Sequence, residues 1–209
     1  MEHIRFHFDP ICPWAWVTSR WAQRLVELGE LEVTWAFFAL AEQNRTLLTD
    51  PEHRQLATAP LQLLALARQR EGNVAVGRLY TAIGKARHLR GEPIGEPAVL
   101  EACLRAAGLD PAWVAESARD TTCWEAVLTD HRAAVERCGA FGVPTLILDG
   151  GVGPGAFGPV ITQVPDDAEA VALLRDTVGW IRRPYLYELK RERGDVRPVL
   201  GDAPSPAAS

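Results

Sequence analysis

Extended and helical patterns alternate at the start of the chain. In residues 4–8, Ile-Arg-Phe-His-Phe, apolar and polar side chains alternate, which predicts a short strand with one buried face. From residue 13 to residue 28 the apolar positions follow helical spacing, with Pro13 in the first turn and Gly29 as the stop signal. Residues 31–40 are rich in Val, Thr, Trp and Phe, which indicates a second strand. If this strand pairs parallel to the first, the three segments form a βαβ unit.

The middle of the chain has a different pattern. Between about residues 51 and 139, helix-forming residues dominate, and apolar positions recur at helical spacing with interruptions. The strongest helical segments are residues 61–70, 74–87, 98–107 and, with breaks, 113–138. We therefore predict an all-helical block between two segments that contain strands.

The last part of the chain returns to a mixed pattern. Residues 144–149 have strand character, and a glycine-rich turn separates them from residues 156–162, which predicts a hairpin. Residues 166–180 are periodic and helical. Residues 184–193 are charged and periodic, and we predict a short amphipathic helix there.

The order βαβ, helical block, ββα places one small mixed sheet in two separate parts of the sequence. We predict an α/β domain built from residues 1–50 and 140–195, with helices on both faces of its sheet. Residues 51–139 form the helical insertion. Residues 196–209 are rich in Pro, Ala and Ser, which predicts a flexible tail.

Charge and hydropathy limit the classes of partner. The formal net charge of the 209 residues is -5, so the chain offers no broad positive field for a nucleic acid. No apolar run approaches the roughly 20 residues that cross a bilayer, and the N-terminus has no export signal. We expect a cytoplasmic protein without a membrane partner, and the frequent Ala, Arg, Gly and Pro residues suggest an actinobacterial genome.

The chain has four scattered cysteines: Cys12, Cys103, Cys123 and Cys138. Without an export signal, structural disulfides are not expected. No two cysteines have the spacing of a metal site, and we predict no metal. Cys103, Cys123 and Cys138 lie in or next to the helical block and are interpreted as structural residues. Any of them could in principle resolve a disulfide on Cys12, but this requires Cα atoms within about 7 Å of each other.

Cys12 stands at the end of the first predicted strand and opens the sequence Cys12-Pro13-Trp14-Ala15. A thiol at a helix N-terminus faces unpaired backbone N–H groups and the positive end of the helix dipole, which lower the pKa of the thiol below its usual value of about 8.5. The alternative is a small buried hydrophobe at the end of a strand. We favour a nucleophilic thiolate because the helix-cap position, Pro13 and the flanking tryptophans coincide at Cys12.

Five further residues are candidates for binding a substrate or a thiol. Trp14 and Trp16 offer aromatic surface near Cys12, although tryptophans at helical spacing often serve packing alone. Tyr80 in the helical block could supply a hydroxyl near the sulfur or pack in the core. Val143-Pro144 opens a later strand, where a cis peptide bond can be accommodated.

Other polar residues near Cys12 are interpreted as structural. His7 and Asp9 could tune the thiolate, but alternation places His7 on the face opposite Phe6 and Phe8, as a solvent-facing or sheet-covering side chain. Arg20 and Arg24 could attract a carboxylate-bearing thiol. A solvated charged face is the preferred interpretation of both arginines.

The chain resembles the DsbA-like branch of the thioredoxin superfamily in three features. These are the Cys-Pro-Trp turn, the helical insertion and the sequence Gly142-Val143-Pro144-Thr145. Nearly the whole chain up to Arg193 resembles the actinobacterial mycothiol-dependent nitroreductases. The matching segments are Phe8-Asp9-Pro10-Ile11-Cys12-Pro13-Trp14, Trp16-Val17-Thr18-Ser19-Arg20-Trp21, Leu79-Tyr80-Thr81-Ala82-Ile83-Gly84, Phe157-Gly158-Pro159-Val160 and Tyr187-Glu188-Leu189-Lys190-Arg191.

This resemblance implies a thioredoxin fold with a helical insertion. It also implies that Cys12 is the attacking thiolate, that Val143–Pro144 is the cis-proline segment beside it, and that the Val143 backbone holds an extended thiol or substrate. A low-molecular-weight thiol, mycothiol or glutathione, is the implied reductant, and a homodimer is the implied assembly.

The sequence departs from this family at Ala15, where the family pattern carries a second cysteine. Without it, a thiol from solution has to complete the exchange that Cys12 starts. We favour a thiol-dependent oxidoreductase. The alternatives are a cis–trans isomerase, in which the Cys12 thiolate adds reversibly to a conjugated alkene, and a non-catalytic binding module with a thioredoxin-like scaffold.

Overall fold

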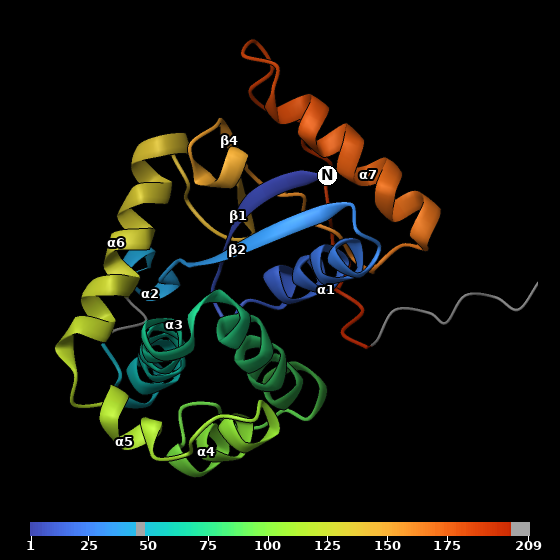
Figure 1. Cartoon of the computed structure of the whole chain (residues 1–209). Coiled ribbons are helices and arrows are strands. Elements are labelled where there is room, and N and C mark those ends of the chain that lie inside the picture. The colour runs from blue at the N-terminus through green and yellow to red at the C-terminus, as the bar shows by residue number, and fades with distance from the viewer. Residues whose placement is uncertain (45–48, 202–209) are drawn as a thin grey trace, which may run out of the picture.

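A four-stranded mixed sheet organises the computed structural model, which describes residues 1–44 and 49–201 (Figure 1). Strands β1 (Glu2–Phe8) and β2 (Leu31–Phe37) are parallel, and β3 (Thr145–Leu148) lies antiparallel to β1 on its other side. Strand β4 (Gly155–Phe157) pairs antiparallel with β3, so the order across the sheet is β2-β1-β3-β4. The predicted thioredoxin fold is confirmed.

Alternation along β1 assigns its two faces. Ile4, Phe6 and Phe8 are fully buried on one face, where the Phe8 ring stacks on Tyr80 with 3.9 Å between the ring centroids. His7 points to the other face and is also fully buried. Both faces of this central strand are therefore covered by protein, as in an α/β layer architecture.

Helix α1 (Pro13–Glu27) follows β1 directly and begins with Pro13, which presets the backbone torsion of the first turn. Helix α7 (Asp167–Ile181) lies beside α1 (Figure 1). The indole N–H of Trp21 in α1 donates a hydrogen bond to the Ala170 carbonyl of α7 at 3.0 Å. This contact joins the first and last helices of the thioredoxin-like part.

The helical insertion is also present. A short helix, α2 (Leu40–Gln43), follows β2. The insertion contains α3 (Pro51–Gly84), a π-helical turn (Lys85–Leu89), α4 (Pro97–Ala106), α5 (Trp113–Ser117) and α6 (Thr121–Cys138). Helix α3 is interrupted at Gly72, whose φ of 76° lies in the left-handed region that glycine adopts readily. The interruption falls between the two helical segments expected at residues 61–70 and 74–87.

Helix α6 joins the insertion to the sheet. The Asp130 carboxylate accepts hydrogen bonds from the buried Phe37 backbone N–H of β2, at 3.0 Å, and from Arg68 of α3. The centroid of the His131 ring in α6 also lies 4.3 Å from the centroid of the Phe38 ring, which follows β2. The insertion therefore packs against the sheet.

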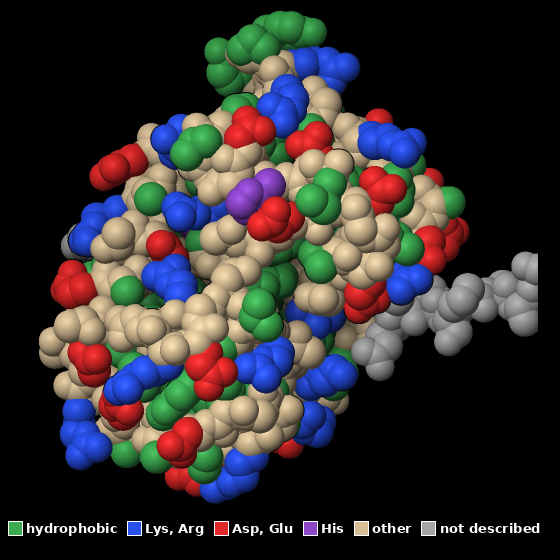
Figure 2. Space-filling view, in the orientation of Figure 1, with side chains coloured by type: hydrophobic (Ala, Val, Ile, Leu, Met, Phe, Trp, Pro, Cys, Tyr) green, Lys and Arg blue, Asp and Glu red, His purple; other side chains and the backbone are tan. Residues whose placement is uncertain are grey.

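The helix predicted for residues 184–193 is wrong. No helix follows α7 there, and the chain projects beyond the end of α7 as an irregular loop (Figure 1). Tyr185, Tyr187 and Leu189 are 75%, 89% and 72% exposed, and Figure 2 shows hydrophobic side chains on this projection. A short helix needs tertiary packing of its apolar face, and the described residues offer this segment no such surface.

The chain then returns across α1. The Val199 N–H donates to the Thr162 carbonyl at 2.6 Å, and the indole N–H of Trp16 donates to the Leu200 carbonyl at 3.3 Å. Val199 and Leu200 belong to the tail expected at residues 196–209, so this part of the tail is held by hydrogen bonds. Residues 202–209 of the expected tail lie outside the described residues. Among the described residues, no helix is long and apolar enough to cross a membrane.

Candidate active site

Cys12 is the N-cap residue of α1 and sits where the sequence analysis places it. Its backbone is extended, and its Sγ atom accepts a hydrogen bond from the Ala15 N–H at 3.5 Å. The Cys12 thiol donates to the Val143 carbonyl, also at 3.5 Å, and the Val143–Pro144 peptide bond is cis. Two segments that are 131 positions apart in sequence thus meet at one sulfur atom.

The electrostatics of Cys12 differ from the sequence expectation. Burial raises the pKa of the thiol above its ordinary value and outweighs the backbone N–H groups of Ala15 and Trp14, which lower it. The Asp9 charge raises this pKa further, and the Arg193 charge lowers it. The expected low pKa is therefore wrong for this arrangement, because the side chain is only 9% exposed. Near neutral pH the thiol is protonated and donates to Val143.

Asp9 is a buried carboxyl close to this thiol. One of its carboxylate oxygens accepts from the Ile11 N–H at 3.1 Å and the other from the Leu40 N–H at 2.9 Å, which fixes the turn after β1. Burial raises the pKa of Asp9 to about 7. The sequence suggested that Asp9 could tune the thiolate, but a structural interpretation was preferred. Its position directly after a buried strand and three residues before Cys12 was the available signal.

The aromatic candidates separate into two environments. Trp16 and Tyr80 belong to the core, with exposed fractions of 1% and 0%, and their ring centroids lie 6.0 Å apart in an edge-on contact. Trp16 also packs against Gly84, where an added Cβ would lie 2.1 Å from the indole ring. Trp14 is half-buried, and its ring lies 4.8 Å from the Arg193 guanidinium carbon. Of the three, only Trp14 borders open space.

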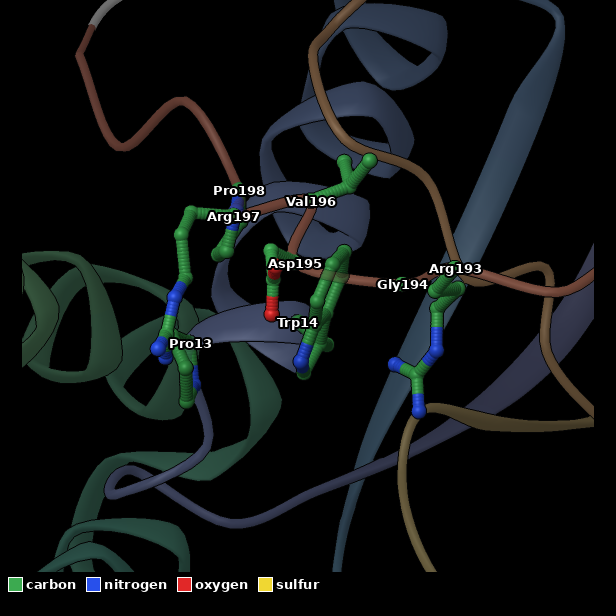
Figure 3. A pocket seen from close by; sticks show the side chains of 8 residues that line it. All are labelled: Pro13, Trp14, Arg193, Gly194, Asp195, Val196, Arg197 and Pro198. Carbon is green, nitrogen blue, oxygen red and sulfur yellow. The ribbon is translucent and has the colours of Figure 1, made fainter.

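A hollow next to Cys12 is lined by Pro13 and Trp14 together with residues 193–198. Its volume is about 290 Å³. In Figure 3 the Trp14 ring stands between the Arg193 side chain and the side chains of Asp195 and Arg197. This wall of the site was not predicted, because no local pattern in residues 193–198 indicates that they lie on α1.

Several polar side chains near the site are more buried than expected. His7 is not solvent-facing, because α6 covers its face of the sheet, and burial lowers the pKa of His7 to about 4. Arg20 places its guanidinium carbon 4.2 Å from the Trp16 ring centroid and donates to the Thr81 hydroxyl at 2.9 Å. Arg24 does match the expected charged surface, where it pairs with Asp167 and Glu27.

None of the other three cysteines forms a disulfide with Cys12 in this structure. Cys12, Cys103, Cys123 and Cys138 are all free thiols. Burial raises the pKa of both Cys103 and Cys123 to about 11, and it also raises the pKa of Cys138. Across residues 1–44 and 49–201, no group of His, Cys, Asp and Glu side chains is arranged to hold a metal ion.

Known proteins are similar to this chain in sequence. A sequence model of the Rv2466c-like family, described as "Mycothiol-dependent nitroreductase Rv2466c", matches residues 11–191. The "Uncharacterized protein Rv2286c" of Mycobacterium tuberculosis is 33% identical over 199 residues, which cover 92% of this chain and 83% of the relative.

Solved structures similar to this one have DsbA-like names. The "probable DsbA oxidoreductase SCO1869" of Streptomyces coelicolor has a TM-score of 0.58 at 20% identity, and the match covers 93% of this chain and 95% of that one. The cytosolic disulfide reductase DsbM of Pseudomonas aeruginosa, solved with GSH, has a TM-score of 0.60 at 16% identity over 85% of this chain and 99% of its own.

A third similar structure carries the name of an isomerase. It is a 2-hydroxychromene-2-carboxylate isomerase, with a TM-score of 0.58 at 15% identity over 85% of this chain and 94% of its own. At these identities the structural matches establish the fold alone. The family model matches residues 11–191, which is most of the chain, and therefore establishes the family. The chain therefore belongs to the Rv2466c-like family and has the DsbA-like form of the thioredoxin fold.

Proposed function

We propose that this protein is a thiol-dependent oxidoreductase in which Cys12 is the only catalytic sulfur and a low-molecular-weight thiol of the mycothiol type is the reductant. The observation that carries the proposal is the meeting of the Cys12 sulfur, the α1 N-terminus and the Val143 carbonyl, with alanine at position 15. The family description and the DsbM structure with GSH support a small thiol as co-reactant.

The chemistry runs through a mixed disulfide. The Cys12 thiolate attacks one sulfur of a substrate disulfide, so that a new S–S bond forms while the old one breaks and the other sulfur leaves as a thiolate. A small thiol then attacks the substrate sulfur and frees Cys12, and a second small thiol releases the substrate. Two small thiols become one disulfide while one substrate disulfide becomes two thiols.

The residues around Cys12 have separate roles in this proposal. The N–H groups of Ala15 and Trp14 stabilise the thiolate once the proton has left. Asp9, whose pKa of about 7 lets it exchange a proton near neutral pH, takes that proton. Backbone groups of Val143 hold an extended thiol or substrate beside the sulfur. The cytoplasmic location and the homodimer remain predictions from the sequence.

A cis–trans isomerase is the second candidate function. The Cys12 thiolate would add to a conjugated alkene, the former double bond would rotate as a single bond, and elimination would return the thiolate and the other geometry. This chemistry needs one sulfur and no net electrons, which suits alanine at position 15. The similarity in fold to a 2-hydroxychromene-2-carboxylate isomerase supports keeping this candidate.

Electron flow distinguishes the two functions. The protein is incubated with glutathione or mycothiol and a small disulfide, and the oxidised thiol is quantified for the wild-type chain and for Cys12→Ser. The oxidoreductase predicts thiol consumption faster than the uncatalysed exchange, and Cys12→Ser should lower it to the uncatalysed rate. Consumption that is equal in the two proteins would overturn the proposal. Conversion of alkene geometry by Cys12 without thiol consumption would replace it with the isomerase.

A further inference from the structure

We propose that the hollow formed by Trp14 and residues 193–198 is a binding site for the anionic group of an aromatic substrate, carboxylate being the expected anion. This inference rests on the proposed function and adds to it a substrate class. It makes Arg193 and Arg197 specificity-determining residues in a segment that neither the sequence pattern nor the comparisons assign to the site.

The charges in the hollow favour an anion. Arg193 and Arg197 both line it, and neither guanidinium has a carboxylate partner within residues 1–44 and 49–201. The one acidic lining residue is Asp195, so the side chains of the hollow carry a net single positive charge. The N-terminal end of α1 adds the positive end of its dipole. A guanidinium presents two parallel N–H donors that match a carboxylate.

The aromatic preference comes from Trp14 and from the size of the hollow. The half-buried Trp14 ring offers a flat apolar surface on which another ring can stack. A volume of about 290 Å³ lies at the lower end of small-molecule pockets. It therefore suits a single substituted ring rather than a whole cofactor.

The position of the hollow links it to the chemistry. Pro13 and Trp14 follow Cys12 directly, and the Trp14 N–H and the Arg193 charge both act on the Cys12 thiol. In this proposal, a ligand held in the hollow presents its neighbouring bond to the same sulfur. When the arginines bind the anionic group, they orient the substrate so that the bond farther from the anion faces the Cys12 sulfur.

The wall formed by residues 193–198 is anchored from both sides. The Arg193 guanidinium packs on Trp14, and the Val196 N–H closes a turn by donating to the Arg193 carbonyl at 3.1 Å. Beyond the wall, the Val199 and Leu200 backbones are hydrogen-bonded to Thr162 and Trp16. These contacts hold the arginines over α1 before any ligand arrives, which favours binding.

Two aromatic disulfides test this site directly. 5,5′-Dithiobis(2-nitrobenzoate) carries a carboxylate on each ring, and 2,2′-dithiodipyridine is uncharged. In both reactions the Cys12 thiolate attacks one sulfur, a mixed disulfide forms, and the other aryl thiolate leaves and is followed by its absorbance. The rate at Cys12 is the difference between the wild-type protein and Cys12→Ser, which removes the reaction of the other thiols.

The readout is the ratio of the two rates, because a change in Cys12 reactivity alone affects both reagents. We expect Arg193→Ala and Arg197→Ala each to lower the ratio of anionic to neutral reagent by about tenfold, and added salt to lower it in the wild-type protein. Asp195→Asn should raise the ratio. Arg191→Ala removes the same charge from the same segment outside the hollow and serves as the matched control.

The outcomes separate the site from the function. If Cys12 reacts with both reagents and the ratio is the same in Arg193→Ala, Arg197→Ala and Arg191→Ala, the anion site is overturned while the proposed function stands. If neither reagent reacts faster with the wild-type protein than with Cys12→Ser, the proposed function fails and the anion site fails with it.

Discussion

At the scale of single residues, the Cys12 sulfur experiences opposing influences. The α1 N–H groups favour the thiolate, and burial favours the thiol, which donates to the Val143 carbonyl. Sequence alone could place Cys12 at a helix N-terminus, because Pro13 and the helical spacing are local signals. It could not give the pKa direction, because the desolvation depends on segments that are distant in sequence.

The first residue-scale prediction concerns the pH dependence of Cys12 alkylation. Because burial raises the pKa of this thiol above 9.0, the thiolate fraction keeps increasing through the neutral and mildly alkaline range. Reaction with iodoacetamide at Cys12, followed by peptide mass spectrometry, should accelerate steadily from pH 7 to pH 9. A plateau at or below pH 7 would show that the helix N-terminus dominates instead.

The second residue-scale prediction concerns Asp9 and the pH dependence of the free energy of unfolding. Burial raises the pKa of Asp9 from 3.8 to about 7, so between these pH values the folded state binds a proton that the unfolded state has released. The stabilising contribution of Asp9 to the free energy of unfolding is fully present below pH 3.8 and is lost as pH rises through 7. The wild-type free energy of unfolding should therefore fall by about 3 kcal/mol relative to that of Asp9→Asn between pH 5 and pH 8.

Urea unfolding of both proteins at each pH measures this difference. His7 and His88, whose pKa values burial lowers to about 4, contribute stability that is lost as pH falls from 6.5 toward 4. Both proteins share that effect, so it cancels in the comparison. Parallel pH profiles for wild type and Asp9→Asn would show that Asp9 has an ordinary carboxyl pKa.

At the scale of elements, local periodicity predicted most helices and strands, although the strand expected at residues 156–162 spans only Gly155–Phe157. The strand expected at residues 4–8 spans Glu2–Phe8, and the one expected at 31–40 spans Leu31–Phe37. The failure at residues 184–193 has a physical reason, since a periodic segment forms a helix only where its apolar face finds a partner. Sequence periodicity does not report whether that partner exists.

The N-terminus of α1 supports an element-scale prediction. Position 15 lies one turn after Cys12, and its backbone N–H already contacts the Cys12 sulfur. In Ala15→Cys, the new thiol should attack a mixed disulfide on Cys12 and form an internal disulfide, with the loss of two hydrogens in the intact mass. The small-thiol adduct should then no longer accumulate.

Ala22→Cys is the matched control, because it places a buried thiol on the same helix two turns farther from Cys12. It should leave the adduct on Cys12 unchanged. A persistent adduct in Ala15→Cys would mean that the first turn of α1 does not bring the two sulfurs together, and the proposed resolution by a thiol from solution would lose its structural explanation.

At the scale of the whole molecule, the site depends on contacts between parts that are far apart in sequence. Trp16 of α1 packs on Gly84 at the end of α3, and the chain after α7 returns to cover α1. The sequence predicted the helical insertion and the two strand-containing segments on either side of it. It did not predict the placement of residues 193–198, because that placement follows from hydrogen bonds to Thr162 and Trp16 rather than from a local pattern.

The contact between the insertion and α1 can be tested at Gly84. A Cβ there would lie 2.1 Å from the buried Trp16 ring, which has no free space to move. Gly84→Ala should cost about 3 kcal/mol, which corresponds to a decrease in Tm of roughly 6–12 °C for a chain of this size. Gly179→Ala in α7 meets only the flexible end of Arg183 at 3.3 Å and should leave Tm unchanged within about 2 °C. Equal Tm values for the two variants would contradict the close packing of α1 on α3.

The central claim is that Cys12 alone carries the chemistry and forms a mixed disulfide that no second sulfur of the chain resolves. Intact-mass spectrometry after exposure to oxidised glutathione or oxidised mycothiol at pH 9, beside Cys12→Ser, measures this directly. We expect one stable thiol adduct on the wild-type protein and none on Cys12→Ser. No adduct, or an adduct that persists in Cys12→Ser, would remove Cys12 from the mechanism and favour a non-catalytic binding module.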